Sequence, residues 1–277
     1  MKLALSRLEA RIEQAIGFSR EIRVTIAGEP FVIDSACGHR GELNDYDYGW
    51  LRALAANKSS VLDIGSSVGL TALLFTRHIV PNGICVLADL SQCSLSLAAR
   101  NLKRAGLLRR AAFARVRMAD SDLPHLTALG DNIVLRNDEL ADVIRALEGM
   151  GSEVPNCTVD TLCSTISVTP DLIKIDVEGA EQQVLRGAGG VAIGCQPAIQ
   201  VELHSFPPMT MHENARHTLD WCAAHGYQMW YLATGAIVRD AEQIASRGRC
   251  HVLLLPANRA YPAALEGIAQ AGGPSAR

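Results

Sequence analysis

The chain has 277 residues, of which 48% are hydrophobic and 20% are charged. These are ordinary values for a globular protein with a substantial core, so they exclude disorder as its main state, and the length allows one large domain or two small ones. Lys and Arg together number 26 against 29 for Asp and Glu, which gives a net charge of −3. No basic excess or basic run therefore favours binding to nucleic acid or to an anionic membrane.

Nothing in the sequence predicts membrane insertion or secretion. The apolar stretches are far shorter than the roughly 20 residues of a membrane-spanning helix. Residues 1–20 lack the unbroken apolar core of a secretory signal. We therefore expect a cytoplasmic protein. Its eight cysteines include no CxxC pair and are expected to be free thiols rather than disulfides or zinc ligands.

The first elements form an irregular N-terminal region. Residues 1–17 carry apolar side chains at helical spacing, which predicts an amphipathic helix. Residues 21–33 predict two short strands around an Ala-Gly-Glu-Pro turn. Residues 46–57 predict a helix whose aromatic side chains we expect in the core, the alternative being a wall of the functional site.

A regular alternation of strands and helices begins at residue 60. Apolar strands over 60–64 and 84–90 are each followed by a predicted helix, over 70–79 and 91–105. Fully apolar strands that alternate with helices indicate a parallel sheet covered on both faces. A third strand is predicted over 112–118.

The second half continues the same pattern after a less regular segment over 120–160. The predicted strands are 171–177, 198–204, 227–233 and 251–255, and the predicted helices are 138–147, 179–187 and 211–225. On the last of these helices, His212, Glu213 and His217 could be metal ligands, but a solvated helix face is the favoured interpretation.

A loop of small residues follows the first strand of the alternating region. It consists of Asp63, Ile64, Gly65, Ser66, Ser67, Val68 and Gly69. Small residues let a ligand approach the backbone, and the following helix offers free N–H groups. Asp63 precedes the first glycine and would repel the pyrophosphate that a GxGxxG loop binds. A carboxylate there suits a cationic nucleoside such as S-adenosylmethionine (SAM), so Asp63, Gly65, Ser66, Ser67 and Gly69 are predicted cofactor-binding residues.

Further acidic residues follow the next strands. Asp89 ends the second strand, where a carboxylate can accept both hydrogen bonds of a ribose diol. Asp120 follows the third strand and is predicted to receive the adenine amino group, with Asp131 as its rival. The alternatives are that Asp63 and Asp89 are solvated strand ends, or that the site binds NAD.

A second polar group lies on two later strands. Lys174 and Asp176 are two residues apart, hence on one face of a strand expected to be buried on both sides. Gln200, Glu202 and His204 share a face of the next strand. Each buried charge needs a partner, so Lys174 is predicted to be a charge partner rather than a nucleophile. Polar groups at the carboxyl ends of adjacent parallel strands predict a site, with a purely structural ion-pair network as the alternative.

These motifs resemble the FkbM family of SAM-dependent methyltransferases. The resemblance rests on the loop 63–69, on residues 171–181 and 184–188, and on residues 201–204, and it covers roughly residues 60–205. The stretch IKIDVEGAE is its specific part. The sequence departs from the family pattern at Ser66-Ser67, where a small residue and Asn are usual, and at Asp89-Leu90, where Glu-Pro is common. Such enzymes are typically O-methyltransferases acting on sugars, polyketides and other natural products.

The resemblance implies an α/β fold of the Rossmann-like class I methyltransferase type. We expect a seven-stranded, doubly wound sheet with its last strand antiparallel. Residues 1–57 are expected to form an extension that covers the cofactor and acceptor site, residues 58–260 the methyltransferase domain, and residues 261–277 a partly disordered tail.

The expected reaction is methylation of a hydroxyl on a small-molecule acceptor. Such a hydroxyl needs a base to take its proton, and His204 is the first choice because imidazole titrates near neutral pH. Asp176, Glu202 and Glu178 are the other catalytic candidates. These four could instead hold a divalent metal ion, but no metal site is predicted.

Several alternatives stay open at this stage. The enzyme could methylate nitrogen, or the chain could be a methyltransferase-like binding protein without turnover. No nucleic-acid or membrane partner is expected, and the sequence leaves a homo-oligomer open.

Overall fold

The computed structural model describes residues 20–43, 47–122, 129–205 and 209–268. The helix predicted over residues 1–17 and the end of the predicted tail, residues 269–277, lie outside these ranges. Within the part of the chain that the structure describes, no helix combines the length and the apolar character that a membrane crossing needs.

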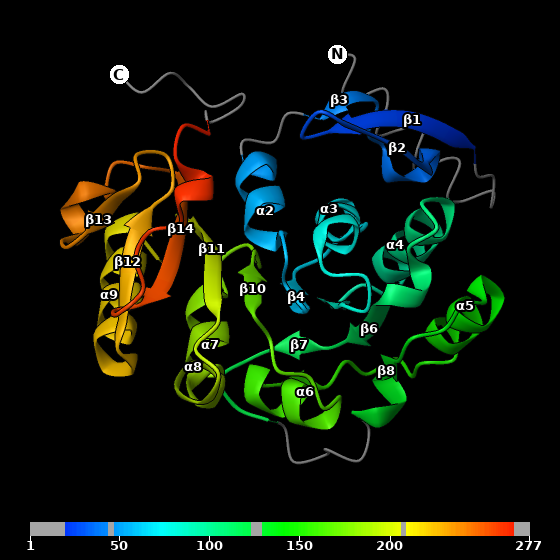
Figure 1. Cartoon of the computed structure of the whole chain (residues 1–277). Coiled ribbons are helices and arrows are strands. Elements are labelled where there is room, and N and C mark those ends of the chain that lie inside the picture. The colour runs from blue at the N-terminus through cyan, green and yellow to red at the C-terminus, as the bar shows by residue number, and fades with distance from the viewer. Residues whose placement is uncertain (1–19, 44–46, 123–128, 206–208, 269–277) are drawn as a thin grey trace.

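One large sheet organises the molecule (Figure 1). It has nine strands in the order β13-β12-β14-β11-β10-β4-β5-β6-β8. The strands are β4 (Ser60–Ile64), β5 (Ile84–Asp89), β6 (Ala111–Arg115), β8 (Ile133–Val134), β10 (Leu172–Ile175), β11 (Ala198–His204), β12 (Tyr227–Tyr231), β13 (Ala236–Val238) and β14 (Arg249–Pro256). Strands β4, β5, β6, β10 and β11 are parallel, whereas β14 runs antiparallel to both β11 and β12.

This topology confirms the predicted fold. Seven strands, in the order β6-β5-β4-β10-β11-β14-β12, form the expected doubly wound sheet, and the antiparallel β14 is the last of them in the chain. The short strands β8 and β13 add antiparallel edges that the sequence did not predict. The chain winds outward from β4 to β6 on one side and from β10 on the other, so the topological switch point lies between β4 and β10. Ligands of open α/β sheets bind beyond the carboxyl ends of the strands at such a point.

Helices cover both faces of the sheet (Figure 1). One core contains side chains of α2 (Tyr48–Ala55), α3 (Leu70–His78), α4 (Gln92–Arg104) and α5 (Leu140–Glu148). The other contains side chains of α6 (Val159–Thr165), α7 (Glu181–Arg186), α8 (Gly189–Gly194) and α9 (Met211–His225). Neighbouring strand residues such as Val61 and Leu62 enter opposite cores, which explains the unbroken apolar character of these strands.

Three details differ from the prediction. The strand expected over 112–118 is split, because β7 (Arg117–Met118) leaves the main sheet and pairs with β9 (Asn156–Cys157). The helix expected from residue 179 begins at Glu181, since Glu178 and Gly179 have positive φ angles of 52° and 105°. Helix α6, capped by the Thr158 side chain, was not predicted.

The N-terminal region packs on one face of the main domain. Strands β1 (Glu21–Ile26) and β2 (Glu29–Asp34) confirm the predicted pair, and β3 (Gly41–Leu43) extends them into a three-stranded sheet. The Arg77 guanidinium of α3 lies 3.6 Å from the centre of the Phe31 ring. At the other end of the chain, Leu265 is buried. All eight cysteines are free, as predicted.

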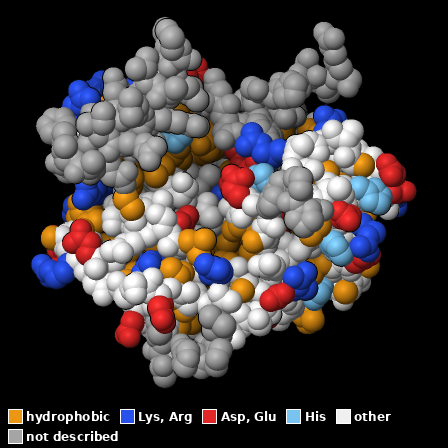
Figure 2. Space-filling model, turned by 180° about the vertical axis from the view of Figure 1, so that it is seen from behind, with side chains coloured by type: hydrophobic (Ala, Val, Ile, Leu, Met, Phe, Trp, Pro, Cys, Tyr) orange, Lys and Arg blue, Asp and Glu red, His pale blue; other side chains and the backbone are white. Residues whose placement is uncertain are grey.

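Charged side chains of both signs are interspersed on the face seen in Figure 2, with apolar side chains exposed between them. This mixture agrees with the net charge of −3. It is typical of a solvated surface rather than of a face that binds a single extended polyanion.

Candidate active site

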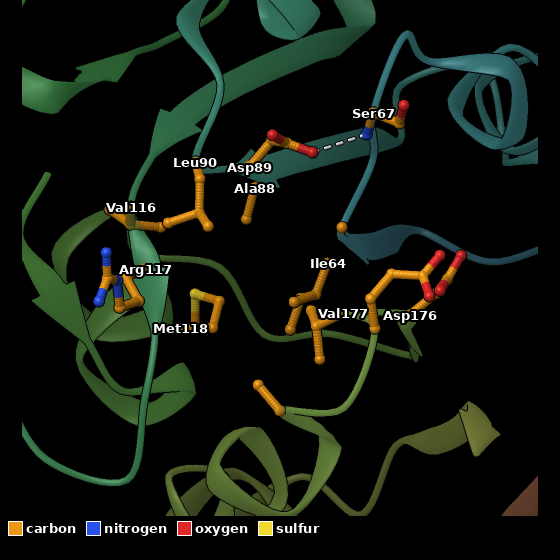
Figure 3. Close-up of a pocket in the computed structure, with 13 residues that line it drawn as sticks. Ile64, Ser67, Ala88, Asp89, Leu90, Val116, Arg117, Met118, Asp176 and Val177 are labelled. Carbon is orange, nitrogen blue, oxygen red and sulfur yellow. Dashed lines mark hydrogen bonds between the residues drawn. The ribbon is translucent and has the colours of Figure 1, made fainter. Parts of the chain in front are cut away.

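A cavity of about 350 Å³ lies at the switch point of the sheet (Figure 3). The segments that follow β4, β5, β6 and β10 form its walls. Its lining residues are Ile64, Gly65, Ser67, Ala88, Asp89, Leu90, Val116, Arg117, Met118, Asp176, Val177, Glu178 and Ala180. Its volume falls in the range of small-molecule and cofactor sites, about 300–1,000 Å³.

The glycine loop owes its shape to close packing as well as to ligand access. Gly65 has a φ of +74°, and a Cβ there would lie 1.7 Å from the carbonyl oxygen of Asp176. Gly69 has a φ of +80°, and its Cβ would lie 2.7 Å from the Cβ of Ala98 on α4. Both glycines are therefore needed for the loop to seat against β10 and α4. Ser66 is buried between them, whereas Ser67 lines the cavity.

Asp89 is the predicted cofactor residue that the structure places most clearly at the cavity (Figure 3). Its Oδ2 accepts a hydrogen bond of 2.8 Å from the backbone N–H of Ser67, and its Oδ1 accepts one of 2.8 Å from that of Ser91. A carboxylate oxygen has two acceptor sites, so each oxygen can accept one more hydrogen bond. The contact of Asp89 with a ribose stays a prediction that this geometry permits.

Apolar side chains form much of the remaining lining of the cavity. Leu90, Val116 and Met118 face it together with Ile64 and Val177 (Figure 3). Leu90 is 50% exposed, which is unusual for a large apolar side chain next to a buried strand. No role was predicted for these apolar residues from the sequence, although the position of Leu90 directly after Asp89 was a usable signal.

Asp63 lies beneath the cavity rather than in its lining. It is fully buried, its Oδ2 accepts a hydrogen bond of 2.5 Å from Thr71, and its Oδ1 lies 3.6 Å from the Lys174 ammonium. Lys174 also contacts Asp176 at 3.1 Å, so it is the predicted charge partner. Burial opposes its charged form, but the charges of Asp63 and Asp176 outweigh burial and raise the pKa of Lys174. A direct contact between Asp63 and a ligand stays a prediction.

The two candidates for the adenine contact lie outside the lining of the cavity. Asp120 is half exposed, and its Oδ2 accepts hydrogen bonds of 3.1 and 2.9 Å from Arg186. These hydrogen bonds hold the pKa of Asp120 below its usual range. Asp131 lies in a short 3₁₀ helix, Gly130–Asn132. The choice between them stays open.

The catalytic candidates come together at the edge of the cavity. We call Asp176, Glu178, Glu181, Glu202 and His204 the carboxylate–imidazole cluster. Measured from Nε2 of His204, the carboxylate oxygens of Glu178, Glu202 and Asp176 lie at 3.4, 3.6 and 3.9 Å. Asp176 and Glu178 also line the cavity, so the cluster adjoins it directly.

Burial and mutual charge shift the proton affinities in this cluster. Burial raises the pKa of Glu202 to about 8, and the nearby Asp176 charge adds to this effect. Burial opposes the charged form of His204, but its hydrogen bond to Glu181 and the charges of Glu181, Glu202 and Glu178 outweigh it and raise the pKa of His204. Strongly perturbed groups beside a cavity are typical of functional sites.

A deeper layer behind Glu202 includes a residue of the N-terminal region. Oε1 of Glu202 lies 3.0 Å from Nε of Arg249 and 3.8 Å from Nε2 of His251. Nδ1 of His251 in turn lies 3.8 Å from Oδ2 of Asp47, just before α2. Burial and the neighbouring cations hold the pKa of His251 well below its usual range. No sequence signal linked Asp47 to the site.

Among the residues that the structure describes, two triads have the side-chain types and spacing that a divalent cation uses. They are Asp176, Glu202 and His204, and Asp47, Glu202 and His251, with ligand atoms within 4.8 Å of one another in each. The prediction of no metal site is not tested by this geometry.

Two cavity-lining residues other than glycine have a left-handed backbone conformation. Ser67 has a φ of +48° and Glu178 a φ of +52°. Such conformations cost about 1–3 kcal/mol each and cluster at functional sites. At Glu178 the strained backbone brings the carboxylate beside His204.

The remaining candidates have structural roles. Tyr48 and Trp50 are buried in the core, as the favoured interpretation held, whereas Tyr46 lies outside the described residues. Glu213 caps α9 by bonding to Thr210. The His212 ring lies 3.5 Å from exposed Glu242, which fits a solvated helix face.

Comparison with known proteins gives one family match. Residues 119–229 match the model of the methyltransferase FkbM domain. This segment contains the whole carboxylate–imidazole cluster and Asp120, whereas the glycine loop and Asp89 precede it. No curated protein matches the sequence.

Three of the solved structures with similarity to this chain have low sequence identity to it. Cofactor-bound Rv0187 from MTB has a TM-score of 0.45 and 18% identity over 76% of this chain and 79% of that chain. The FkbM methyltransferase from Methylobacillus flagellatus KT has a TM-score of 0.45 and 11% identity over 72% and 44%. The O-methyltransferase TomG from Streptomyces achromogenes, in complex with SAM, has a TM-score of 0.40 and 12% identity over 75% and 77%.

Proposed function

Residues 119–229 match the model of the methyltransferase FkbM domain, and from this match and the geometry of the site we propose that the chain transfers the methyl group of SAM to a hydroxyl group of a small molecule. One observation carries the proposal. The cavity at the switch point has the glycine loop and Asp89 on one side and the carboxylate–imidazole cluster on the other. A nucleoside held by the first side would present its reactive end to the second.

The lining of the cavity fits SAM. Asp89 has free acceptor sites for the ribose hydroxyls, and Leu90, Val116 and Met118 offer an apolar slot for the adenine ring. Asp176 and Glu178 place negative charge where a sulfonium and an ammonium would be favoured. When bound, SAM supplies a methyl group that is already activated for transfer.

The protein's own contribution is alignment and proton removal. Holding the acceptor oxygen in line with the methyl group lowers the activation barrier by several kcal/mol. Nε2 of His204 takes the hydroxyl proton as the oxygen–carbon bond forms. The carboxylate of Glu178 lies 3.4 Å from that nitrogen and stabilises the imidazolium that results.

The acceptor is proposed to be a sugar, a glycoside or another natural product with a free hydroxyl. The carboxylates and imidazole beside the cavity are groups that hydrogen-bond hydroxyls. The interspersed surface charges and the net charge of −3 favour a small molecule over a nucleic acid.

Calorimetric titration of the full chain tests the cofactor. S-adenosylhomocysteine should bind with micromolar or tighter affinity, and NAD should not bind. A panel of hydroxylated and aminated acceptors with labelled SAM then distinguishes oxygen from nitrogen as the methylated atom. Binding of NAD alone would contradict the proposal.

A further inference from the structure

We propose that Glu181 is a positioning residue that holds His204 in the tautomer with its proton on Nδ1, which leaves Nε2 free to accept the proton of the acceptor. The inference rests on the proposed function for its catalytic consequence, but not for the tautomer itself. Glu181 is the first residue of α7, and its Oε1 lies 2.9 Å from Nδ1 of His204.

The surroundings of Glu181 make its carboxylate an acceptor at every contact. The side chain is fully buried. Oε1 also accepts a hydrogen bond of 2.8 Å from the backbone N–H of Gly179, and Oε2 accepts one of 3.4 Å from Nδ2 of Asn214. An ionised carboxylate can only accept, so Nδ1 of His204 must be the donor in their hydrogen bond.

Asn214 fixes this arrangement from the other side. Its Nδ2 also donates to the backbone carbonyl of His204 at 3.0 Å, and its Oδ1 accepts a hydrogen bond of 2.6 Å from Gln182. The amide of Asn214 therefore points its nitrogen toward both Glu181 and His204. The backbone and the ring of His204 are held by one buried network.

Nε2 of His204 lies on the side of the ring next to the cavity-lining residues Asp176 and Glu178. Nε2 lies 3.4 Å from Glu178, which is 85% exposed and lines the cavity, whereas Nδ1 faces buried Glu181. The two ring nitrogens thus have different tasks. A carboxylate behind an imidazole orients the ring and raises its basicity, and in metal sites the removal of such a partner from a ligating histidine typically costs about 10–100-fold in affinity or activity.

The tautomer is tested by nitrogen NMR of the ¹⁵N-labelled full chain. Above the pKa of His204, its Nδ1 should show the shift of a protonated nitrogen and its Nε2 that of an unprotonated one. Loss of these signals in His204→Asn assigns them. A neutral His204 protonated on Nε2 would overturn the inference, and this measurement needs neither turnover nor a known acceptor.

The catalytic consequence is tested with Glu181→Gln and an acceptor that the panel of hydroxylated and aminated compounds shows to be methylated. Plateau kcat should fall at least tenfold, and the acidic limb of the kcat–pH profile should move to lower pH, because the charge that raises the pKa of His204 is gone. Glu181→Asp keeps the charge and should keep the position of that limb. The affinity for S-adenosylhomocysteine should stay unchanged.

Glu213→Gln is the matched control, since Glu213 is also an acid in the first turn of a helix but lies outside the cluster. It should leave the profile unchanged. A uniform loss of activity in Glu181→Gln without a shift of the acidic limb would show a merely structural role. Failure of the wild-type chain to bind S-adenosylhomocysteine would instead contradict the proposed function and leave the NMR result standing.

Discussion

The aspartates of the site show how surroundings decide the role of one side-chain type. Asp63 is fully buried and bound by Thr71 and Lys174, whereas Asp89 lines the cavity with acceptor sites to spare. Both residues were predicted to bind the cofactor because each is an acid at the carboxyl end of a parallel strand. Asp89 is in the lining of the cavity, whereas a direct contact between Asp63 and a ligand stays a prediction.

Replacement of Asp89 by Asn tests the ribose contact. The affinity for S-adenosylhomocysteine should fall at least about tenfold, or 1.4 kcal/mol, because a charged acceptor of two hydrogen bonds becomes a neutral one. Calorimetric titration measures this change. Asp138→Asn, at an exposed position, is the control. Equal affinity in wild type and Asp89→Asn would remove the ribose assignment.

Replacement of His204 by Ala separates chemistry from binding. Turnover should fall by about 10²-fold or more, which is typical of the loss of a general base. The dissociation constant of S-adenosylhomocysteine should change less than twofold. His217→Ala, on the half-exposed face of α9, should behave as wild type. Full activity of His204→Ala would eliminate it as the base.

The raised pKa of Glu202 predicts a pH-dependent stability. Its pKa rises from 4.5 unfolded to about 8 folded, so between these values the folded protein holds a proton that the unfolded chain releases. The free energy of unfolding should therefore fall as pH rises through this window.

Glu202→Gln should flatten this dependence. Urea unfolding at pH 5, 6, 7 and 8 compares the two proteins, with Glu148→Gln at an exposed position as the control. Parallel stability curves for wild type and Glu202→Gln would show that Glu202 titrates normally.

At the scale of elements, the glycine loop, β10 and α4 depend on one another. Gly65→Ala should strongly destabilise the fold, because its Cβ would lie 1.7 Å from the carbonyl oxygen of Asp176. Gly106→Ala is a matched control, since Gly106 has a similar φ of +70° but nothing within 4 Å of its Cβ. The control should cost only about 1 kcal/mol of backbone strain.

Urea unfolding of both variants measures the difference. We expect Gly65→Ala to cost several kcal/mol more than Gly106→Ala, as overpacking against backbone does not relax easily. Equal costs would show that the loop has room that the structure does not provide.

The sequence predicted the existence of the longer strands and helices better than it predicted the residues at which they begin and end. Strand β11 and helix α9 have the predicted bounds, because apolar periodicity and the Gly226 cap are local signals. Helix α7 begins two residues later than predicted, because Glu178 and Gly179 have a left-handed backbone that the apolar periodicity does not encode.

At the scale of the whole molecule, one side chain joins the N-terminal sheet to the glycine loop. Buried Asn101 on α4 accepts a hydrogen bond of 2.8 Å from the backbone N–H of Asp34 and donates one of 2.9 Å to the carbonyl of Val68. The N-terminal sheet therefore supports the loop from behind. The cavity itself is lined by residues between Ile64 and Ala180, so the covering role expected of residues 1–57 stays a prediction.

Asn101→Leu should lower the free energy of unfolding by about 1–3 kcal/mol, because it leaves buried backbone groups without partners. Urea unfolding measures this loss, and calorimetry should show weaker binding of S-adenosylhomocysteine. Asn82→Leu, at an exposed turn, is the control. An unchanged stability would show that the N-terminal sheet docks independently of Asn101.

The sequence by itself determined the order of the longer strands and helices, the position of the glycine loop, and the polar residues on two neighbouring strands. These features depend on local periodicity and on residue types that a few neighbours decide. It also placed His204, Glu202 and Asp176 in one group, because parallel strands end at the same edge.

Only the tertiary structure decided which charged side chains lie next to one another. The sheet register sets Lys174 beside Asp63 and Glu202 beside His251. Packing of α7 and of the segment before α2 brings Glu181 to His204 and Asp47 to His251. Such pairs join residues far apart in the chain, and their partners follow from strand order and helix packing rather than from any local pattern.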